Sequence, residues 1–229
     1  MIQASKTPRD LLITIDGPAG AGKTTVSRKL AQALGYRYID TGALYRAIAL
    51  AASERGVADD DDAALDFLCA NLSLEFTVEE HGLRLMLDGR DVTDRIRSPQ
   101  ITMLASAISA RPVVRGHLLT VQRNLGASRR AVFEGRDMGT VVFPDADVKF
   151  FLSADPSIRA RRRYEELVAK GGAAPSITSV EQDMAERDRN DSTRRSAPLK
   201  PATDAIHIDS STLGIDGVVA LMLEHIMDC

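Results

Sequence analysis

The stretch ITIDGPAGAGKTTVSRKLAQAL, residues 13–34, constrains the fold more than any other part of this chain. Residues 17–24 match G-x-x-x-x-G-K-[ST] without a gap, after a segment typical of a strand and before a helical pattern. Glycines in such a loop let backbone N–H groups point at phosphate oxygens, and the following helix adds the positive end of its dipole. An incidental glycine-rich turn would not need the whole pattern. We therefore expect the loop to bind a nucleoside triphosphate.

The side chains at the end of this loop have separate expected roles. Lys23 supplies an ammonium group for the β- and γ-phosphates, and the Thr24 hydroxyl is a ligand for Mg²⁺. The residues expected to bind the triphosphate are Gly17, Pro18, Ala19, Gly20, Ala21, Gly22, Lys23, Thr24 and Thr25.

Short apolar segments alternate with helical patterns along the chain. The strand candidates are LLITID, YRYID, AVFEG, DVKFFLS and AIHID, and residues 22–35, 43–55, 155–170 and 214–227 show helical spacing. This order predicts an α/β fold in which helices cover both faces of a parallel five-stranded sheet.

Residues 60–110 break this rhythm. LSLEFTVEEHGLRLMLDGRDVT alternates apolar and polar residues around an EEHG turn, which predicts an antiparallel hairpin. ADDDDAALDFLCANL before it reads as a helix, and two helices after it are separated near Pro112. We therefore expect a core of residues 1–59 and 111–229 that carries an insertion of residues 60–110. KGGAAPSITS, from Lys170, is a candidate hinge.

Composition excludes several classes of protein. The net charge of −3 argues against a dedicated nucleic-acid binder. No run of 18 apolar residues predicts a membrane span, and the polar start MIQASKTPRD is unlike a secretory signal, so we expect a cytoplasmic protein. The two cysteines and four histidines show no metal-binding spacing.

Triphosphate binding leaves three classes open: a small-molecule kinase, a regulatory switch and a mechanical ATPase. A guanine-specific switch normally carries N-K-x-D, and no asparagine here precedes a lysine. A mechanical ATPase usually has a hydrophobic strand ending in Asp-Glu, which is also missing. The remaining motifs instead suit a second anionic substrate.

The segment YRYIDTGALYRA offers one candidate site for a monophosphate. Thr41 and Tyr45 share a face at the start of a predicted helix, with Arg46 adjacent. A helix start beside a guanidinium suits a phosphate group. The alternative is a capping threonine and a solvated arginine.

Two further segments combine arginine with aspartate. In AVFEGRDMGTVVFPDA, Arg136 and Asp137 follow a strand at the carboxyl edge, where parallel sheets bind ligands; a turn salt bridge is the alternative. In AERDRNDSTRRSAPLKPATDA, Arg187, Asp191 and Arg194 fall on one helical stripe; a solvated run of charges is the alternative.

Several blocks together resemble the bacterial cytidylate kinase family. IDGPAGAGKTT, IDTGALYRAIAL, LDGRDVTDRIR, EGRDMGTVVFPDA and RDRNDSTRRSAPLKPATDAIHIDSS occur in the family's order and at similar spacings, over about residues 10–227. The phosphate loop alone is widely shared, whereas the last two blocks are far more specific. The resemblance implies that residues 60–110 bind the monophosphate and that a helical lid of about residues 155–185 closes over ATP.

The resemblance also implies roles for individual residues. Thr41, Tyr45 and Arg46 lie near the substrate, Ser106 and Arg115 contact the cytosine ring and the α-phosphate, and Arg136 and Asp137 bind phosphate and ribose. Arg187, Asp191 and Arg194 complete the contacts to the ribose, base and phosphate. In the lid helix IRARRRYEEL, Arg159 and Arg163 are chosen as phosphate contacts, although a shift of one residue would change that choice. Lys23, Arg136, Asp137, Arg159 and Arg163 form the expected catalytic set.

The implied reaction transfers a phosphoryl group from ATP, with Mg²⁺, to CMP or dCMP. Its partners are these nucleotides alone, with no nucleic acid or membrane, and we expect a monomer. Three rivals are a monophosphate kinase that prefers UMP or AMP, a nucleotide-binding regulatory module, and a small-metabolite kinase such as one for shikimate. The last is disfavoured by the insertion and by the second arginine block.

Overall fold

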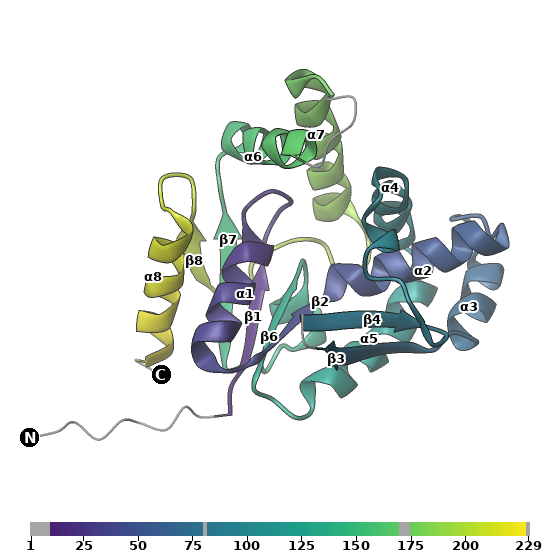
Figure 1. Ribbon diagram of the computed structural model, residues 1–229, viewed down its shortest axis with the longest axis horizontal. Helices are drawn as coiled ribbons and strands as arrows, with labels where there is room; N and C mark the ends of the chain where they lie inside the picture. Colours follow the sequence, from purple (N-terminus) through teal and green to yellow (C-terminus); the bar gives the residue numbers. More distant parts are fainter. Residues whose placement is uncertain (1–9, 80–81, 170–174, 228–229) are drawn as a thin grey trace, which may run out of the picture.

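The computed structural model describes residues 10–79, 82–169 and 175–227 of the chain. A five-stranded parallel sheet has the order β2–β6–β1–β7–β8 (Figure 1). Its strands are β1 (Leu12–Asp16), β2 (Arg37–Asp40), β6 (Ala131–Gly135), β7 (Val148–Ser153) and β8 (Ile206–Asp209). The predicted α/β class, parallel sheet and five strand segments are confirmed.

Successive residues of a strand point to opposite faces of the sheet. Apolar residues of the strands therefore lie on both faces, and helices cover each face. Ile13 and Ile15 of the central strand β1 pack against α1 (Lys23–Leu34) and α8 (Ile215–Met227). Leu12 faces the other way, into a cluster formed with the π-helical turn Met138–Val142 and α5 (Pro112–Gly126).

The predicted antiparallel hairpin is present beside the main sheet. β3 (Leu74–Glu79) pairs with β4 (Gly82–Leu87), and β4 pairs with the short strand β5 (Arg90–Asp91). Two residues of the predicted EEHG turn, Glu80 and His81, lie outside the described residues. The predicted helices around the hairpin are also present: α3 (Asp62–Ala70) and α4 (Pro99–Ile108), the latter after the short helix Arg95–Arg97.

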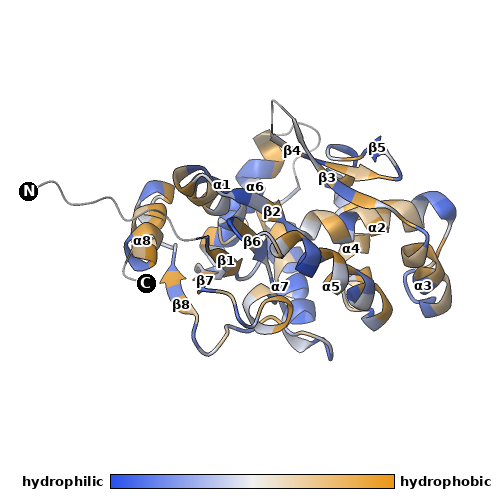
Figure 2. Cartoon of the chain, turned by 90° about the horizontal axis from the view of Figure 1, so that it is seen from below, coloured by the Kyte–Doolittle hydropathy of each residue, from blue (hydrophilic) through white to orange (hydrophobic). Residues whose placement is uncertain are grey.

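The insertion shares its apolar core with helices that flank it in the sequence. α2 (Thr41–Arg55) and α5 pack with α3, β4 and α4 around Leu44, Ile48 and Leu87. Figure 2 shows these helices gathered at one end of the molecule, with β3–β5 along their edge. The residues that carry the candidate monophosphate motif on α2 are therefore held by the same core as the insertion.

Two helices lie above the carboxyl ends of the main strands (Figure 1). α6 (Pro156–Ala169) and α7 (Ile177–Thr193) pack together through Ala160, Val180 and Met184. Residues 170–174 of the candidate hinge lie outside the described residues, and Ser176 caps α7 by accepting a hydrogen bond from the Ser179 N–H. No helix in the described part of the chain has the length and apolar character needed to cross a membrane.

Candidate functional site

The carboxyl edge of the main sheet opens into a cavity of about 1020 Å³. The phosphate loop forms one wall, α2 and α4 form another, and residues of α6 and α7 lie above them. This is the edge at which parallel α/β sheets place their ligands.

The phosphate loop is held tightly against the sheet. Gly17 has a φ of 147°, and a Cβ placed on it would lie 2.0 Å from the carbonyl oxygen of Leu152 in β7. Gly22, directly before α1, has a left-handed conformation, and within the described residues no side chain caps this helix. The first N–H groups of α1 are therefore left for an anion.

Lys23 is buried at the start of α1. Its Nζ donates a hydrogen bond of 2.7 Å to the Pro18 carbonyl oxygen. Burial, and next the positive charge of Arg136, lower the pKa of Lys23 to about 7. The amine is thus placed where an anion would favour its charged form.

Glu134, near the end of β6, lines the cavity although no sequence motif predicts it there. Its carboxylate accepts hydrogen bonds of 2.7 Å from the Thr24 hydroxyl and from the Tyr38 hydroxyl. Burial, and then the Asp40 carboxylate, raise the pKa of Glu134, whereas Lys23 opposes this shift. A single acidic residue in the apolar strand AVFEG was the available signal.

Arginine and aspartate side chains form a buried network on the opposite wall. Asp137 accepts hydrogen bonds from Arg115 and from Arg194, the latter at 3.2 Å. Arg136 donates to Asp191 at 2.8 Å. Burial raises the pKa of Asp137 despite the two arginines. At Asp191 burial also acts to raise the pKa, but Arg136, Arg187 and Arg194 together lower it below the usual value. These predicted residues, far apart in sequence, therefore form one cluster.

Two cations between the loop and this network retain unused donors. Arg187 of α7 is surrounded by protein, and burial, then Arg136, lower its pKa to about 10. The Nε atoms of Arg187 and Arg46 are buried without a hydrogen-bond partner in the described part of the chain. Arg46 also pairs with Asp40 at 2.7 Å. Buried, unsatisfied guanidinium donors are suited to a phosphate group.

The start of α2 differs from the simple alternative considered for it. Asp40, not Thr41, caps this helix by accepting a hydrogen bond from the Ala43 N–H. The Thr41 hydroxyl donates to the Glu134 carbonyl oxygen at 2.7 Å. Tyr45 lies beneath Arg115, whose guanidinium carbon is 5.7 Å from the ring centre.

The cavity wall contains most of the predicted residues. Those present are Ala19, Gly20, Ala21, Gly22, Lys23, Thr24, Thr25, Thr41, Tyr45, Arg46, Ser106, Arg115, Arg136, Asp137, Arg163, Arg187, Asp191 and Arg194. Gly17, Pro18 and Arg159 are not part of the wall, and Arg159 donates instead to the carbonyl oxygens of Ala154 and Ala19.

Other wall residues were not predicted. Arg97, Thr102 and Ser109 lie near Ser106 on the insertion side, and Arg162 lies beside Ser210 on the side of α8. Leu213 and Ile215 give that end an apolar surface, with 39% and 44% of each residue exposed. Arg97 and Arg162 lie in the quoted segments LDGRDVTDRIR and IRARRRYEEL, but no role at the site was predicted for them, and the fold brings them to the cavity.

Chemically, the cavity provides two places for phosphate groups. The loop, Lys23 and the N-terminus of α1 form one, and Arg46, Arg136 and Arg187 form the other. Among the described residues, no group of three or more histidine, cysteine, aspartate or glutamate side chains is arranged to bind a metal ion. The Thr24 hydroxyl and the Glu134 carboxylate place hard oxygen atoms beside the loop.

Comparison with known proteins gives the family to which these features correspond. The family model described as cytidylate kinase matches residues 13–228. A cytidylate kinase from Geobacter sulfurreducens is 52% identical over 214 residues, which cover 93% of this chain and 91% of that protein. A cytidylate kinase from Pseudomonas aeruginosa is 47% identical over 216 residues, covering 93% of this chain and 94% of that protein.

The fold also occurs in a solved structure of distant sequence. An uncharacterized protein from Eubacterium ventriosum superposes with a TM-score of 0.54 at 11% sequence identity, covering 96% of this chain and 99% of that one. This likeness concerns the fold alone.

Proposed function

Because the chain belongs to the cytidylate kinase family, we propose that it transfers the γ-phosphoryl group of ATP to CMP or dCMP, giving ADP and CDP or dCDP. The observation that carries this proposal is one cavity whose wall holds both a phosphate loop and a separate cluster of arginines. Two polyanions that react in line need two such cationic places.

The acceptor nucleotide occupies the side of the insertion. Arg46, Arg136 and Arg187 bind its phosphate, since their guanidinium groups match phosphate oxygens in a fixed geometry. Asp137 and Asp191 accept hydrogen bonds from the ribose and from the exocyclic amine of cytosine. Ser106, which lies on the wall, provides a further polar contact to the base.

The donor nucleotide occupies the side of α8. Its phosphates lie in the loop, where Lys23 and the N-terminus of α1 balance their charge. Its base lies toward the exposed apolar residues Leu213 and Ile215, below Arg162.

The residues beside the loop fit a magnesium ion. The Thr24 hydroxyl and the Glu134 carboxylate are hard oxygen ligands 2.7 Å apart, both on the cavity wall. When bound, Mg²⁺ neutralises charge on the β- and γ-phosphates. We propose that Thr24 and Glu134 hold it, directly or through its water molecules.

The reaction needs no general base from the protein. The second pKa of a phosphate monoester is near 6, so the attacking oxygen of the acceptor is largely ionised at neutral pH. In keeping with this, none of the histidines in the described part of the chain lines the cavity. The protein's task is to align the two nucleotides and to offset their charges, which Lys23 and the arginines perform.

Exclusion of water is the second task, because water is a competing acceptor for the γ-phosphoryl group. We propose that residues 155–185 act as a lid over ATP, with Arg163 directed at the phosphates, and that residues 60–110 close over the monophosphate. A monomer working in the cytoplasm remains our expectation.

A substrate panel tests the proposal. Purified protein is assayed for ADP formation with ATP, Mg²⁺ and, in turn, CMP, dCMP, UMP, AMP and GMP. We expect kcat/KM for CMP or dCMP to exceed that for each other acceptor by at least about 10-fold, since hydrogen-bonded recognition of a base discriminates strongly. ADP formation that does not depend on any monophosphate, or a preference for AMP, would contradict the proposal.

A further inference from the structure

Arg159 does not line the cavity, and its guanidinium contacts three different parts of the protein. Its Nε donates to the Ala154 carbonyl oxygen at 3.0 Å, and its Nη1 donates to the Ala19 carbonyl oxygen at 3.0 Å. The same Nη1 lies 2.6 Å from the Oδ2 of Asp188. One guanidinium of α6 therefore joins the residue that follows β7, the phosphate loop and α7.

The packing around Arg159 brings the same three parts into contact. A Cβ placed on Gly20 of the loop would lie 3.0 Å from the Cβ of Arg159 and 2.8 Å from the Cε of Met184. Ala19 packs against the small apolar core that α6 and α7 share. The loop thus forms one wall of the core that holds these two helices together.

Asp188, which pairs with Arg159, lies next to the cavity residue Arg187 in the sequence. It directly follows Arg187, which lines the cavity and whose Nε is buried without a hydrogen-bond partner in the described part of the chain. The Oδ2 of Asp188 faces Arg159, while its Oδ1 is buried without a hydrogen-bond partner among the described residues. The ion pair therefore determines how the turn of α7 that carries Arg187 lies over the loop.

We propose that Arg159 and Asp188 form a latch that positions the phosphate loop and Arg187 relative to each other for phosphoryl transfer. Arg159 is then a positioning residue that acts through Ala19 and Asp188. This role rests on the proposed function, because it concerns how that reaction is aligned.

The latch and a direct contact between Arg159 and ATP make opposite predictions at Asp188. If Arg159 bound phosphate, removal of the nearby negative charge in Asp188→Asn would strengthen or preserve ATP binding, since Asp188 repels an anion. If Arg159 and Asp188 form a latch, the same substitution weakens catalysis because the loop and α7 lose their fixed alignment. The sign of the effect therefore distinguishes the two roles.

The test compares Arg159→Lys, Asp188→Asn and the double variant with wild type. We expect kcat/KM for ATP to fall about 100-fold in Arg159→Lys and about 10-fold in Asp188→Asn, since a displacement of about 1 Å costs roughly that much. Because Arg187 lies on the acceptor side, kcat/KM for CMP should fall as well in both variants. The double variant should be no worse than Arg159→Lys, because the two residues act as one unit.

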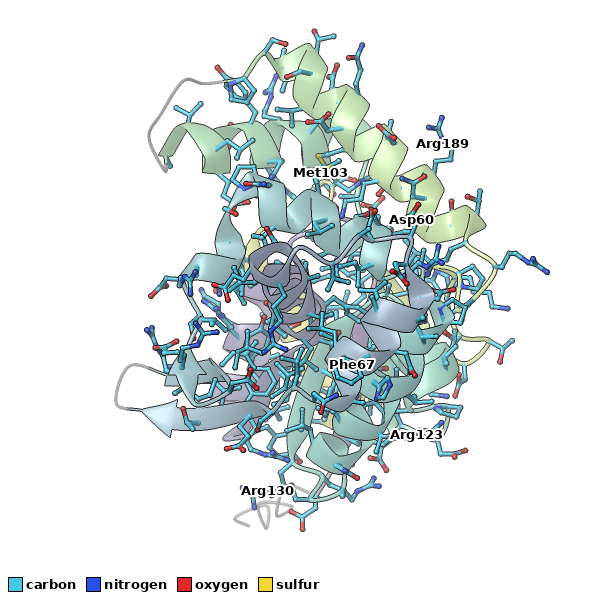
Figure 3. All side chains as sticks on the ribbon, turned by 90° about the vertical axis from the view of Figure 1, so that its right-hand side faces the viewer. Asp60, Phe67, Met103, Arg123, Arg130 and Arg189 are labelled. Carbon is cyan, nitrogen blue, oxygen red and sulfur yellow. The ribbon has the colours of Figure 1, made fainter. Side chains whose placement is uncertain are left out.

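Two exposed neighbours are matched controls for charge and position. Arg161 lies on α6, and Arg189 lies on the outer side of α7 (Figure 3). Arg161→Lys and Arg189→Lys should keep wild-type kinetics. Thermal unfolding of each ligand-free variant gives an independent readout, in which the losses of Arg159→Lys and Asp188→Asn should likewise not add.

Two results would overturn the latch: additive losses in the double variant, or unchanged or improved ATP kinetics in Asp188→Asn. Failure of the proposed function is seen separately, as absence of CMP-dependent ADP formation by the wild-type protein.

Discussion

At the scale of single residues, the positive charge of Lys23, which the phosphate loop needs to bind phosphate, destabilises the folded protein as long as no ligand is bound. Lys23 is 5% exposed, and its pKa is lowered from 10.5 to about 7 by burial and by Arg136. The charged amine therefore lowers the free energy of unfolding below pH 7, and this cost fades as the pH rises from 7 toward 10.5. Binding of phosphate reverses the shift and draws a proton onto the amine.

Replacement of Lys23 by Met should remove the destabilisation caused by the buried ammonium group. It should also remove most of the catalytic activity. At pH 6 we expect the melting temperature of ligand-free Lys23→Met to exceed that of wild type by at least about 2 °C, and the difference to shrink by pH 10. The kcat should fall at least about 100-fold, because the transition state loses its cation. Lys29→Met, at an exposed ion pair with Asp216, is the control for loss of a lysine. A melting temperature of Lys23→Met below that of wild type at pH 6 would contradict the inference that charged Lys23 destabilises the ligand-free protein.

Asp191 belongs to the acceptor side through its bond to Arg136. We expect Asp191→Ala to raise KM for CMP by about 10-fold or more, the usual effect of losing a buried charged hydrogen bond, while KM for ATP changes less than about 2-fold. Steady-state kinetics with each substrate varied in turn give both values. Asp183→Ala, on the exposed side of α7, is the matched control. Equal changes in the two KM values would refute the acceptor role of Asp191.

How far single residues could be predicted depended on whether they lay in a motif. Lys23, Arg136 and Asp191 stand in recognisable blocks, and the structure brings them to one cavity. Glu134 was missed because one acid at the end of an apolar strand lacks the Asp-Glu pair that was sought. Arg162 was missed because several arginines follow one another in residues 159–163. Which of them faces the cavity depends on how α6 packs against α7 and the loop, and no local sequence pattern determines that packing.

At the scale of elements, the strand–loop–helix unit was predictable because each part has a local cause. β1 is a run of apolar and β-branched residues, α1 has helical spacing, and glycines permit the turn between them. The pairing of strands was not predictable, since β6 lies between β1 and β2 although residues 41–130 separate it from β2 and residues 17–130 separate it from β1. Long-range order of this kind is decided by packing of both sheet faces.

Gly17 is a tightly constrained position of the phosphate loop, because the Leu152 carbonyl of β7 leaves no room for a side chain there. We expect Gly17→Ala to lower the free energy of unfolding by at least about 3 kcal/mol and the melting temperature by about 6 °C or more. Gly35→Ala is the control: its φ of 66° is also left-handed, yet nothing lies within 4 Å of the added Cβ. It should cost only about 1 kcal/mol. Similar losses in the two variants would show that contact with β7 is unimportant.

At the scale of the whole molecule, α7 links the two halves of the cavity. It packs against α6 on the donor side and against α4 of the insertion. At 17 residues it is about 26 Å long, with Met184 beside the phosphate loop and Asp191 in the acceptor network. A ligand that orders either end of this helix therefore favours the position that the other ligand needs.

Binding of the two nucleotides should consequently be coupled. With Mg²⁺ and a non-hydrolysable β,γ-imido analogue of ATP at saturation, we expect the Kd for CMP to fall about 5-fold, corresponding to about 1 kcal/mol, and CMP to tighten the analogue by the same factor. Isothermal titration calorimetry measures both. In Asp188→Asn the factor should drop toward one, because α7 is no longer fixed to the loop, whereas Arg189→Lys should retain it. Independent binding in the wild-type protein would mean that the two halves of the cavity are not linked through α7, even if each binds its nucleotide as proposed.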